Sequence, residues 1–228
     1  MARSPSVSKT QIDRLGERLR KGEVTAETLT QLDSYRRLFA DSFEDVIQIV
    51  RAEVGLEPTG RPAKSTTSII EKLRRESIRL GQIQDIAGCR VVVPNLSSQD
   101  GAADRLRGLF AKSAIVDRRL KPSHGYRAVH VIASVRSKPV EIRIRTDLQH
   151  LWAELSEKLS DVYDPAIKYG GGEADLVSGL TEVSDVIAAF ENLEGGEAGA
   201  EFQARKREGQ ARLEKLIADL TRRKGNRA

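Results

Sequence analysis

Apolar residues recur at intervals of three and four positions along the first quarter of the chain. They begin near Gln11 and continue to about Val54, where Gly55 and the Pro-Thr-Gly sequence at 58–60 end the pattern. This spacing places the side chains on one face of a helix. The members of this N-terminal stripe are Leu29, Leu32, Tyr35, Phe39, Phe43, Val46, Ile47 and Val50. The pattern predicts a helical region, preceded by a short polar segment.

Beyond residue 60 short apolar runs alternate with helical spacing. Runs rich in β-branched residues predict strands at 86–93, 114–119, 126–135 and 140–146. Helical spacing predicts helices at 68–80, 104–112 and 148–162. Glycines at 170–172 break the chain, and two more helical patterns follow at 174–193 and 202–224.

These elements predict an α+β fold with a mixed sheet in the middle of the chain. We expect three parts along the sequence. Residues 1–58 form an N-terminal helical extension, residues 59–170 form the core, and residues 171–228 form C-terminal helices with a basic tail.

Composition narrows the class of protein. The chain of 228 residues is 39% hydrophobic and 31% charged, which is typical of a soluble globular protein. The lone Cys89 precedes three valines at 91–93, which indicates a core position, and it has no partner for an intramolecular disulfide. No basic-then-apolar leader pattern opens the sequence, and no apolar run is long enough to span a bilayer. We therefore expect a cytoplasmic protein that makes no use of a membrane.

The positive charge is concentrated at the C-terminal end. Residues 201–228 hold nine Lys/Arg and four Asp/Glu, a balance of +5, which equals the net charge of the whole chain. A cationic helix is a candidate surface for RNA such as tRNA. The interpretation that we favour is a solvated, salt-bridged helix or an assembly helix.

Two acidic residues on predicted strands are candidate metal ligands. Asp85 begins the strand at 86–93, and Glu141 lies in the strand at 140–146. If these strands are neighbours, the two carboxylates can share one Mg²⁺, which prefers oxygen ligands together with phosphates. Glu141 alternates with Arg143 and Arg145, so all three share one strand face. The plainer interpretation is a charged surface with cross-strand pairs.

Cations surround the predicted start of the helix at 68–80. Arg61 and Lys64 precede it, and Lys72 lies about two turns along it. A helix N-terminus favours an anion, and a triphosphate is long enough to reach both lysines. The alternative is that these residues belong to an ordinary charged helix face.

An aromatic residue follows a glycine at the start of the strand at 126–135. Gly125 lets Tyr126 approach a ligand closely, and His130 lies on the same predicted face. An exposed ring offers a stacking surface for a nucleobase. The alternative is a turn glycine with a half-buried tyrosine. Zinc-binding, P-loop and Gly-x-Gly-x-x-Gly patterns are absent from the sequence, which excludes Walker-type ATPase and Rossmann interpretations.

Taken together, these motifs resemble the synthetase domain of the RelA/SpoT family over about residues 60–170. Lys64-x-x-x-Ser68-Ile69-x-x-Lys72 is similar to the family's ATP-binding segment, and residues 85–90 match its Asp-Ile-x-Gly-x-Arg motif. Residues 125–130 resemble Gly-Tyr-Arg-Ser-Leu-His, and residues 141–146 resemble Glu-x-Gln-x-Arg-Thr. The resemblance implies a nucleotidyltransferase-like synthetase core without a hydrolase domain.

It also implies an activity and its residues. The expected reaction transfers the β,γ-pyrophosphate of ATP to the ribose 3′-OH of GDP or GTP, which makes (p)ppGpp and AMP. On the ATP side the resemblance places Arg61, Lys64, Ser68, Lys72 and Arg90. Asp85 and Glu141 would be catalytic residues and ligands of Mg²⁺. The acceptor side comprises Tyr126, Arg127, His130, Arg143, Arg145 and His150.

Departures from the family pattern keep other acceptors open. The family's Arg-x-Lys is one residue longer here, at 61–64, its usual Gln is Arg143, and Ser156-Glu157 replaces the Glu-His of small synthetases. One alternative is a toxin that pyrophosphorylates the 3′ end of tRNA and needs an antitoxin partner. Another is a non-catalytic nucleotide- or RNA-binding module. Members of the family assemble through flanking helices, so we also expect a homo-oligomer, formed through the N-terminal stripe or the tail.

Overall fold

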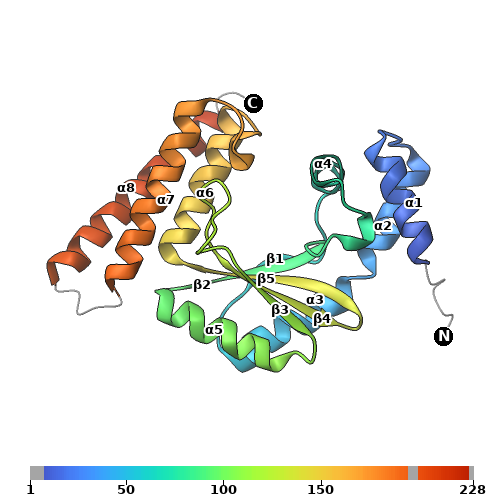
Figure 1. The fold of residues 1–228 in the computed structure, drawn as a ribbon, viewed down its shortest axis with the longest axis horizontal. Coiled ribbons are helices and arrows are strands. Elements are labelled where there is room, and N and C mark those ends of the chain that lie inside the picture. The colour runs from blue at the N-terminus through green and yellow to red at the C-terminus, as the bar shows by residue number, and fades with distance from the viewer. Residues whose placement is uncertain (1–7, 195–199, 226–228) are drawn as a thin grey trace. The chain divides into compact units, whose positions relative to one another are not determined.

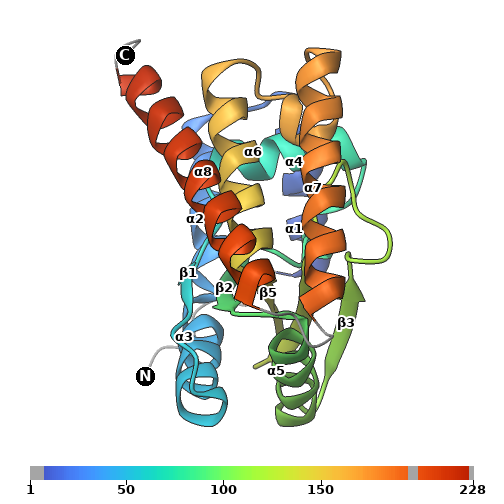
Figure 2. The same cartoon turned by 90° about the vertical axis from the view of Figure 1, so that its left-hand side faces the viewer.

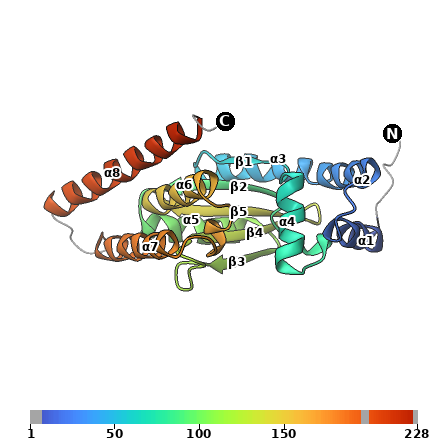
Figure 3. The same ribbon diagram turned by 90° about the horizontal axis from the view of Figure 1, so that it is seen from above.

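A computed structural model describes residues 8–194 and 200–225, and it contains one five-stranded sheet (Figure 1). The strands follow the order β1-β2-β5-β4-β3 across the sheet, as Figure 3 shows. Their bounds are Thr59–Arg61 (β1), Ala87–Val93 (β2), Ser113–Asp117 (β3), Val129–Val135 (β4) and Lys138–Thr146 (β5). A sheet with helices before, within and after it confirms the predicted α+β class.

The helices carry most of the remaining chain. The region predicted to be helical at its start holds α1 (Lys9–Arg20), α2 (Ala26–Arg37), α3 (Ala40–Ile49) and a π-helical turn, η1 (Val50–Val54). Further along lie α4 (Thr66–Glu76), the 3₁₀ turn η2 (Leu80–Gln82), α5 (Leu96–Leu109), α6 (Asp147–Val162), the 3₁₀ turn η3 (Ile167–Tyr169), α7 (Ala174–Glu194) and α8 (Ala200–Gly225). None of the helices in the described ranges is long and apolar enough to cross a bilayer.

Contacts divide the chain into two compact units. The first comprises Met1–Arg90, Leu106–Ala114 and Val131–Arg143, and the second comprises Val91–Arg105, Ile115–His130 and Ile144–Ala228. The three-part division along the sequence that we expected remains a prediction.

In the first unit the N-terminal stripe forms part of the core. Leu32, Val46 and Val50 are fully buried, and Tyr35 and Phe39 pack edge to face with ring centroids 5.3 Å apart. Burial of this apolar surface favours the packed state. The buried residues of the N-terminal stripe are therefore packed inside the first unit. Cys89 is also fully buried here, as predicted, and burial raises the pKa of its thiol to about 12.

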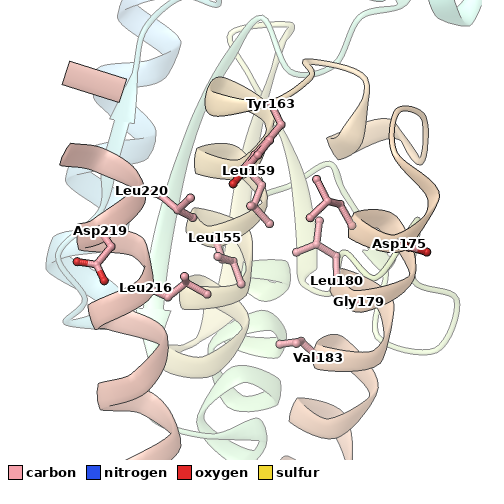
Figure 4. Close-up of a pocket in the computed structure, with 11 residues that line it drawn as sticks. Leu155, Leu159, Tyr163, Asp175, Gly179, Leu180, Val183, Leu216, Asp219 and Leu220 are labelled. Carbon is pink, nitrogen blue, oxygen red and sulfur yellow. The ribbon is translucent and has the colours of Figure 1, made fainter. Parts of the chain in front are cut away.

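In the second unit α6 lies between α7 and α8 (Figures 2 and 3). Trp152 and Leu155 of α6, Leu180 and Ile187 of α7 and Leu220 of α8 are buried in one apolar cluster. A pocket of about 400 Å³ remains among the three helices (Figure 4). Leucines supply most of its lining, which also includes Asp175 and Asp219. This lining lacks the cations that a nucleotide phosphate requires.

Several local features differ from the pattern-based expectations. The helix expected at 68–80 ends at Glu76, because Ser77 is left-handed with φ 51°, and η2 follows as a separate turn. Strand β1 was not predicted, and it pairs antiparallel with β2 at a point where Gly60 faces Cys89. Helix α5 begins at Leu96 rather than near residue 104, because the Asn95 side chain accepts a hydrogen bond from the Ser98 N–H at 2.9 Å and starts the helix earlier. Tyr126 lies in a turn before β4 and not on the strand.

Candidate functional site

Lys64, Lys72 and Asp85 come together in the first unit. Lys64 Nζ lies 2.6 Å from Asp85 Oδ2, and Lys72 Nζ lies 2.9 Å from Asp85 Oδ1. All three side chains are at most one-fifth exposed. We call this set the lysine–aspartate cluster. It brings two cations and one carboxylate, predicted separately from the sequence, into direct contact.

Local structure explains how the cluster forms. The Ser65 hydroxyl accepts a hydrogen bond from the Ser68 N–H and begins α4, so Lys64 directly precedes the helix. The backbone N–H of Lys64 donates to the carbonyl oxygen of Ile86 at 2.6 Å. That bond holds the start of α4 beside Asp85. Lys72 lies on the face of α4 that points toward the same carboxylate.

The two ammonium groups control the charge of Asp85. Burial alone would raise the pKa of its carboxyl, but the charges of Lys64 and Lys72 and their hydrogen bonds outweigh burial and lower it to about 2. Asp85 is therefore ionised at neutral pH. Each lysine ammonium has three N–H donors, so each retains donors beyond the one directed to Asp85.

The other residues expected on the ATP side belong to the same unit but make other contacts. The Ser68 hydroxyl accepts from the Ser65 hydroxyl at 2.8 Å and takes part in the helix cap. Arg90 Nε donates to the Thr59 hydroxyl at 3.0 Å. Arg61 is exposed on β1, opposite Gly88 in the strand register. Their assignment to ATP binding remains a prediction.

Glu141 lies on β5, next to Gly88 of the neighbouring strand β2. A Cβ atom on Gly88 would stand 2.8 Å from the carbonyl oxygen of Glu141, so glycine is required for this approach. The Glu141 carboxylate lies 3.6 Å from Arg143 Nε, an ion pair too long to be a hydrogen bond. Strands β2 and β5 are neighbours in the sheet, which is the condition on which a shared metal site depended.

The donor set can be tested against a divalent metal. Among residues 8–194 and 200–225, no group of three or more His, Cys, Asp and Glu side chains is arranged to hold an ion. Mg²⁺ commonly binds through only one or two carboxylates, and phosphates and waters complete its shell. Asp85 and Glu141 would supply two such carboxylates, and their role as metal ligands remains a prediction.

The second unit holds a separate aromatic cluster of Tyr126, His130 and Arg145. The Tyr126 hydroxyl lies 3.0 Å from His130 Nε2, and Arg145 donates to the same hydroxyl at 3.2 Å. The Arg145 guanidinium also lies 5.1 Å from the centre of the Tyr126 ring. We call this set the tyrosine cluster. The structure thus joins three residues that were assigned to the acceptor side.

The position of Tyr126 depends on the turn before it. Gly125 has φ +84°, and a Cβ atom there would lie 2.7 Å from the Trp152 ring. Tyr126 and His130 are close together, as expected, but they do not share a strand face, because Tyr126 lies outside β4. A glycine turn brings the phenol back to His130, because the chain at Tyr126 has not yet entered β4.

Arg127 and His150 lie in the second unit with other partners. Arg127 is directed to α7, where it donates to the Ser184 hydroxyl at 3.0 Å and to Asp185 at 2.8 Å. His150 Nε2 lies 3.6 Å from Glu154, one helical turn further on. The acceptor roles of both residues remain predictions.

Two residues of α7 were missed by the sequence reasoning. Ser184 and Glu191 are buried polar residues that bind segments next to the tyrosine cluster. Both lie on the helix predicted at 174–193, for which the sequence pattern suggested no functional residue. Glu191 lies four positions after Ile187 and so on the same helix face, which was the available signal, since Glu is almost never buried without partners.

The middle of the chain is similar to known proteins. Residues 60–164 match the family model described as a region found in RelA / SpoT proteins. Uncharacterised proteins of Mycobacterium bovis and Mycobacterium tuberculosis are each 41% identical over 122 residues, which cover 52% of this chain and 45% of theirs. The GTP pyrophosphokinase YjbM of Bacillus subtilis is 33% identical over 122 residues, 46% of this chain and 56% of that protein. The chain thus spans about half the length of the curated relatives that it matches.

Solved structures share the fold. Small alarmone synthetase 1 from Bacillus subtilis, bound to its product pppGpp, superposes with a TM-score of 0.60 at 22% identity, covering 73% of this chain and 95% of that one. Small alarmone synthetase 2 from the same organism gives a TM-score of 0.54 at 22% identity, with 79% and 98% covered. These similarities confirm the predicted synthetase-like fold.

Proposed function

We propose that this protein is an ATP-dependent pyrophosphokinase, because residues 60–164 match the family model described as a region found in RelA / SpoT proteins. It would transfer the β,γ-pyrophosphate of ATP to the ribose 3′-OH of GDP or GTP and release AMP. The observation that carries the proposal is the lysine–aspartate cluster, in which Lys64 and Lys72 both contact Asp85 within 2.9 Å. Paired cations beside an ionised carboxylate suit a bound polyphosphate.

The lysines would bind ATP through donors that are not directed to Asp85. A triphosphate at pH 7 carries several negative charges, and charge-assisted hydrogen bonds to ammonium groups are the strong kind. Asp85 and Glu141 would supply oxygen ligands to Mg²⁺, whose charge offsets that of the phosphates when it is bound. Asp85 is suited to this role because its pKa of about 2 keeps it ionised.

In the transfer step the acceptor 3′-oxygen forms a bond to the β-phosphorus of ATP. The bond from that phosphorus to the oxygen bridging the α- and β-phosphates breaks, and AMP leaves with that oxygen. The proton of the 3′-OH passes to the carboxylate of Glu141, which is 15% exposed and so partly shielded from water. A general base of this kind contributes about 10²–10⁴-fold in rate.

The tyrosine cluster would hold the acceptor base. Tyr126 would offer a ring face, and the hydrogen bonds of its hydroxyl to His130 and Arg145 would hold the phenol in place. Stacking of a base on an aromatic ring contributes about 1–3 kcal/mol. Positioning the nucleophile lowers the entropy cost of the transfer.

The sequence motifs and the similarity to the GTP pyrophosphokinase YjbM of Bacillus subtilis support a guanosine nucleotide as acceptor, and a direct assay tests it. The protein is incubated with γ-labelled ATP and Mg²⁺ and offered GDP, GTP or deacylated tRNA in parallel. We expect label on GDP or GTP. Label on tRNA alone would replace the proposed acceptor and favour the toxin interpretation. Failure of the folded protein to label any of the three would contradict enzymatic function.

Glu141→Gln provides the matching variant. It removes the proposed base with little change in size, and we expect turnover to fall about 10²-fold or more. Glu44→Gln, on the exposed face of α3, is the control and should keep full activity. Circular dichroism and thermal unfolding would establish that both variants fold.

A further inference from the structure

Helix α7, which lies outside the matched region 60–164, is bonded to the turn that carries Tyr126. The Ser184 hydroxyl donates to the carbonyl oxygen of Gly125 at 2.6 Å and accepts from Arg127 Nε at 3.0 Å. Ser184 is 1% exposed. One buried hydroxyl therefore fixes the residues on both sides of Tyr126.

A second buried residue of α7 binds the end of β5. Glu191 is 5% exposed and accepts hydrogen bonds from the Thr146 hydroxyl and from Gln149 Nε2, the latter at 3.0 Å. Burial raises the pKa of this carboxyl, and the two hydrogen bonds act against that rise. Thr146 directly follows Arg145 of the tyrosine cluster and caps α6.

The bonds continue from Glu191 into the sheet. Gln149 Oε1 accepts from Gln99 Nε2 at 2.8 Å, and the same Gln99 nitrogen donates to the carbonyl oxygen of Ile144 at 2.8 Å. Ile144 directly precedes Arg145. The backbone on both sides of this arginine is thus tied into one buried network of the second unit.

Trp152 adds a third attachment in the same place. Its indole N–H donates to the carbonyl oxygen of Leu180 on α7 at 2.7 Å, and its ring lies 6.4 Å from that of Tyr126. The ring also limits the space at Gly125. Helix α7 is therefore bonded, at Leu180, Ser184 and Glu191, to residues that lie next to the tyrosine cluster.

We propose that Ser184 and Glu191 are positioning residues, which hold Tyr126 and Arg145 in the geometry that binds the acceptor nucleotide. This inference rests on the proposed function. Neither residue touches the acceptor itself. Ser184 acts through the backbone of Gly125, and Glu191 acts through Thr146 and the end of β5. The lysine–aspartate cluster belongs to the other unit and shares none of these bonds.

The test separates the two substrates. In Ser184→Ala the Gly125 carbonyl and Arg127 each lose a partner, and we expect the KM for GDP or GTP to rise about tenfold with the KM for ATP unchanged. Glu191→Leu should behave alike. Glu191→Gln should retain near-normal constants, because its amide can donate to Thr146 and accept from Gln149. Exposed residues of the same helix supply the controls, Ser178→Ala and Asn192→Ala, which should leave all constants unchanged.

Binding provides a readout that does not depend on turnover. Trp152 is the single tryptophan of the chain, so its fluorescence reports on this region alone. Titration with GDP should change the emission of the wild-type protein, and the midpoint should move about tenfold higher in Ser184→Ala. If that variant does not fold, Asp185→Ala removes an exposed partner of Arg127 and should give a smaller shift in the same direction.

The outcomes distinguish this inference from the function beneath it. A wild-type protein that transfers label while the Ser184 and Glu191 variants keep normal acceptor constants would overturn the positioning roles alone. An equal rise in the KM for ATP and for the acceptor would also overturn them, since it indicates general loosening of the fold. Absence of both transfer and GDP binding in the wild-type protein would overturn the function and the inference together.

Discussion

Lys72 Nζ lies 2.9 Å from Asp85 Oδ1, although the two residues are separated by 13 positions and lie on different elements. The contact joins the second turn of α4 to the segment that leads into β2. Lys64 meets the other carboxylate oxygen at 2.6 Å. A single carboxylate thus organises both cations, and this arrangement leads to measurable consequences for stability and for binding.

The pH dependence of stability should report on Asp85. Its pKa is lowered from 3.8 to about 2, so the ionised form stabilises the fold above pH 4 and that contribution is lost as the pH falls toward 2. The shift corresponds to about 2 kcal/mol. Urea unfolding of the wild-type protein and of Asp85→Asn should show a stability difference that shrinks by about this amount between pH 5 and pH 2. A difference that stays constant with pH would contradict the pairing.

The two lysines should control the affinity for ATP. Replacing Lys64 or Lys72 with Met keeps most of the side-chain volume and removes the charge. Loss of a charge-assisted hydrogen bond costs about 1.5–3 kcal/mol, so the KM for ATP should rise about 10–100-fold. Lys112→Met, at an exposed position of the same unit, is the control and should leave the KM unchanged. An unaltered KM in both cluster variants would remove these lysines from the ATP site.

Glycine positions should respond in opposite directions. Gly125→Ala places a Cβ 2.7 Å from the Trp152 ring at a φ of +84°, and we expect a loss of about 1–3 kcal/mol in stability together with weaker acceptor binding. Gly179→Ala, within α7, meets no atom within 4 Å and should stabilise the protein by about 0.5–1 kcal/mol. Thermal unfolding measures both changes. Destabilisation by Gly179→Ala would contradict the open space that the structure shows beside Gly179.

The turn between β4 and β5 offers a stabilising substitution. Arg136 and Ser137 both have positive φ, at 48° and 61°. A two-residue turn of this kind favours glycine at its second position. Ser137→Gly should therefore raise the stability by about 0.5–1 kcal/mol. Arg136→Gly should gain less, because Arg136 also forms an ion pair with Asp45 at 2.7 Å. Chemical denaturation of the two variants would reveal whether this order holds.

Much of the fold was predictable because its signals are local. The strands at 86–93 and 140–146 and the helix at 148–162 appear within a residue or two of their expected bounds, since β-branched runs and apolar spacing act over a few neighbouring positions. The short strand β1 was missed because a Thr-Gly-Arg sequence has no apolar pattern. It exists through its pairing with β2, which is a long-range interaction.

The candidate site likewise combines features that local sequence predicts with features that depend on long-range contacts. Sequence motifs by themselves determined which residues we predict to carry the chemistry and which family the chain resembles, because a motif records residue types at fixed spacing. The tertiary structure alone decided that Asp85 pairs with both lysines, that Arg127 is directed to α7, and that a glycine turn brings Tyr126 to His130. The structure also showed that Ser184 and Glu191 form hydrogen bonds with segments next to the tyrosine cluster. The physical reason is that the partner of a buried polar side chain is set by packing between distant segments, which no local pattern encodes.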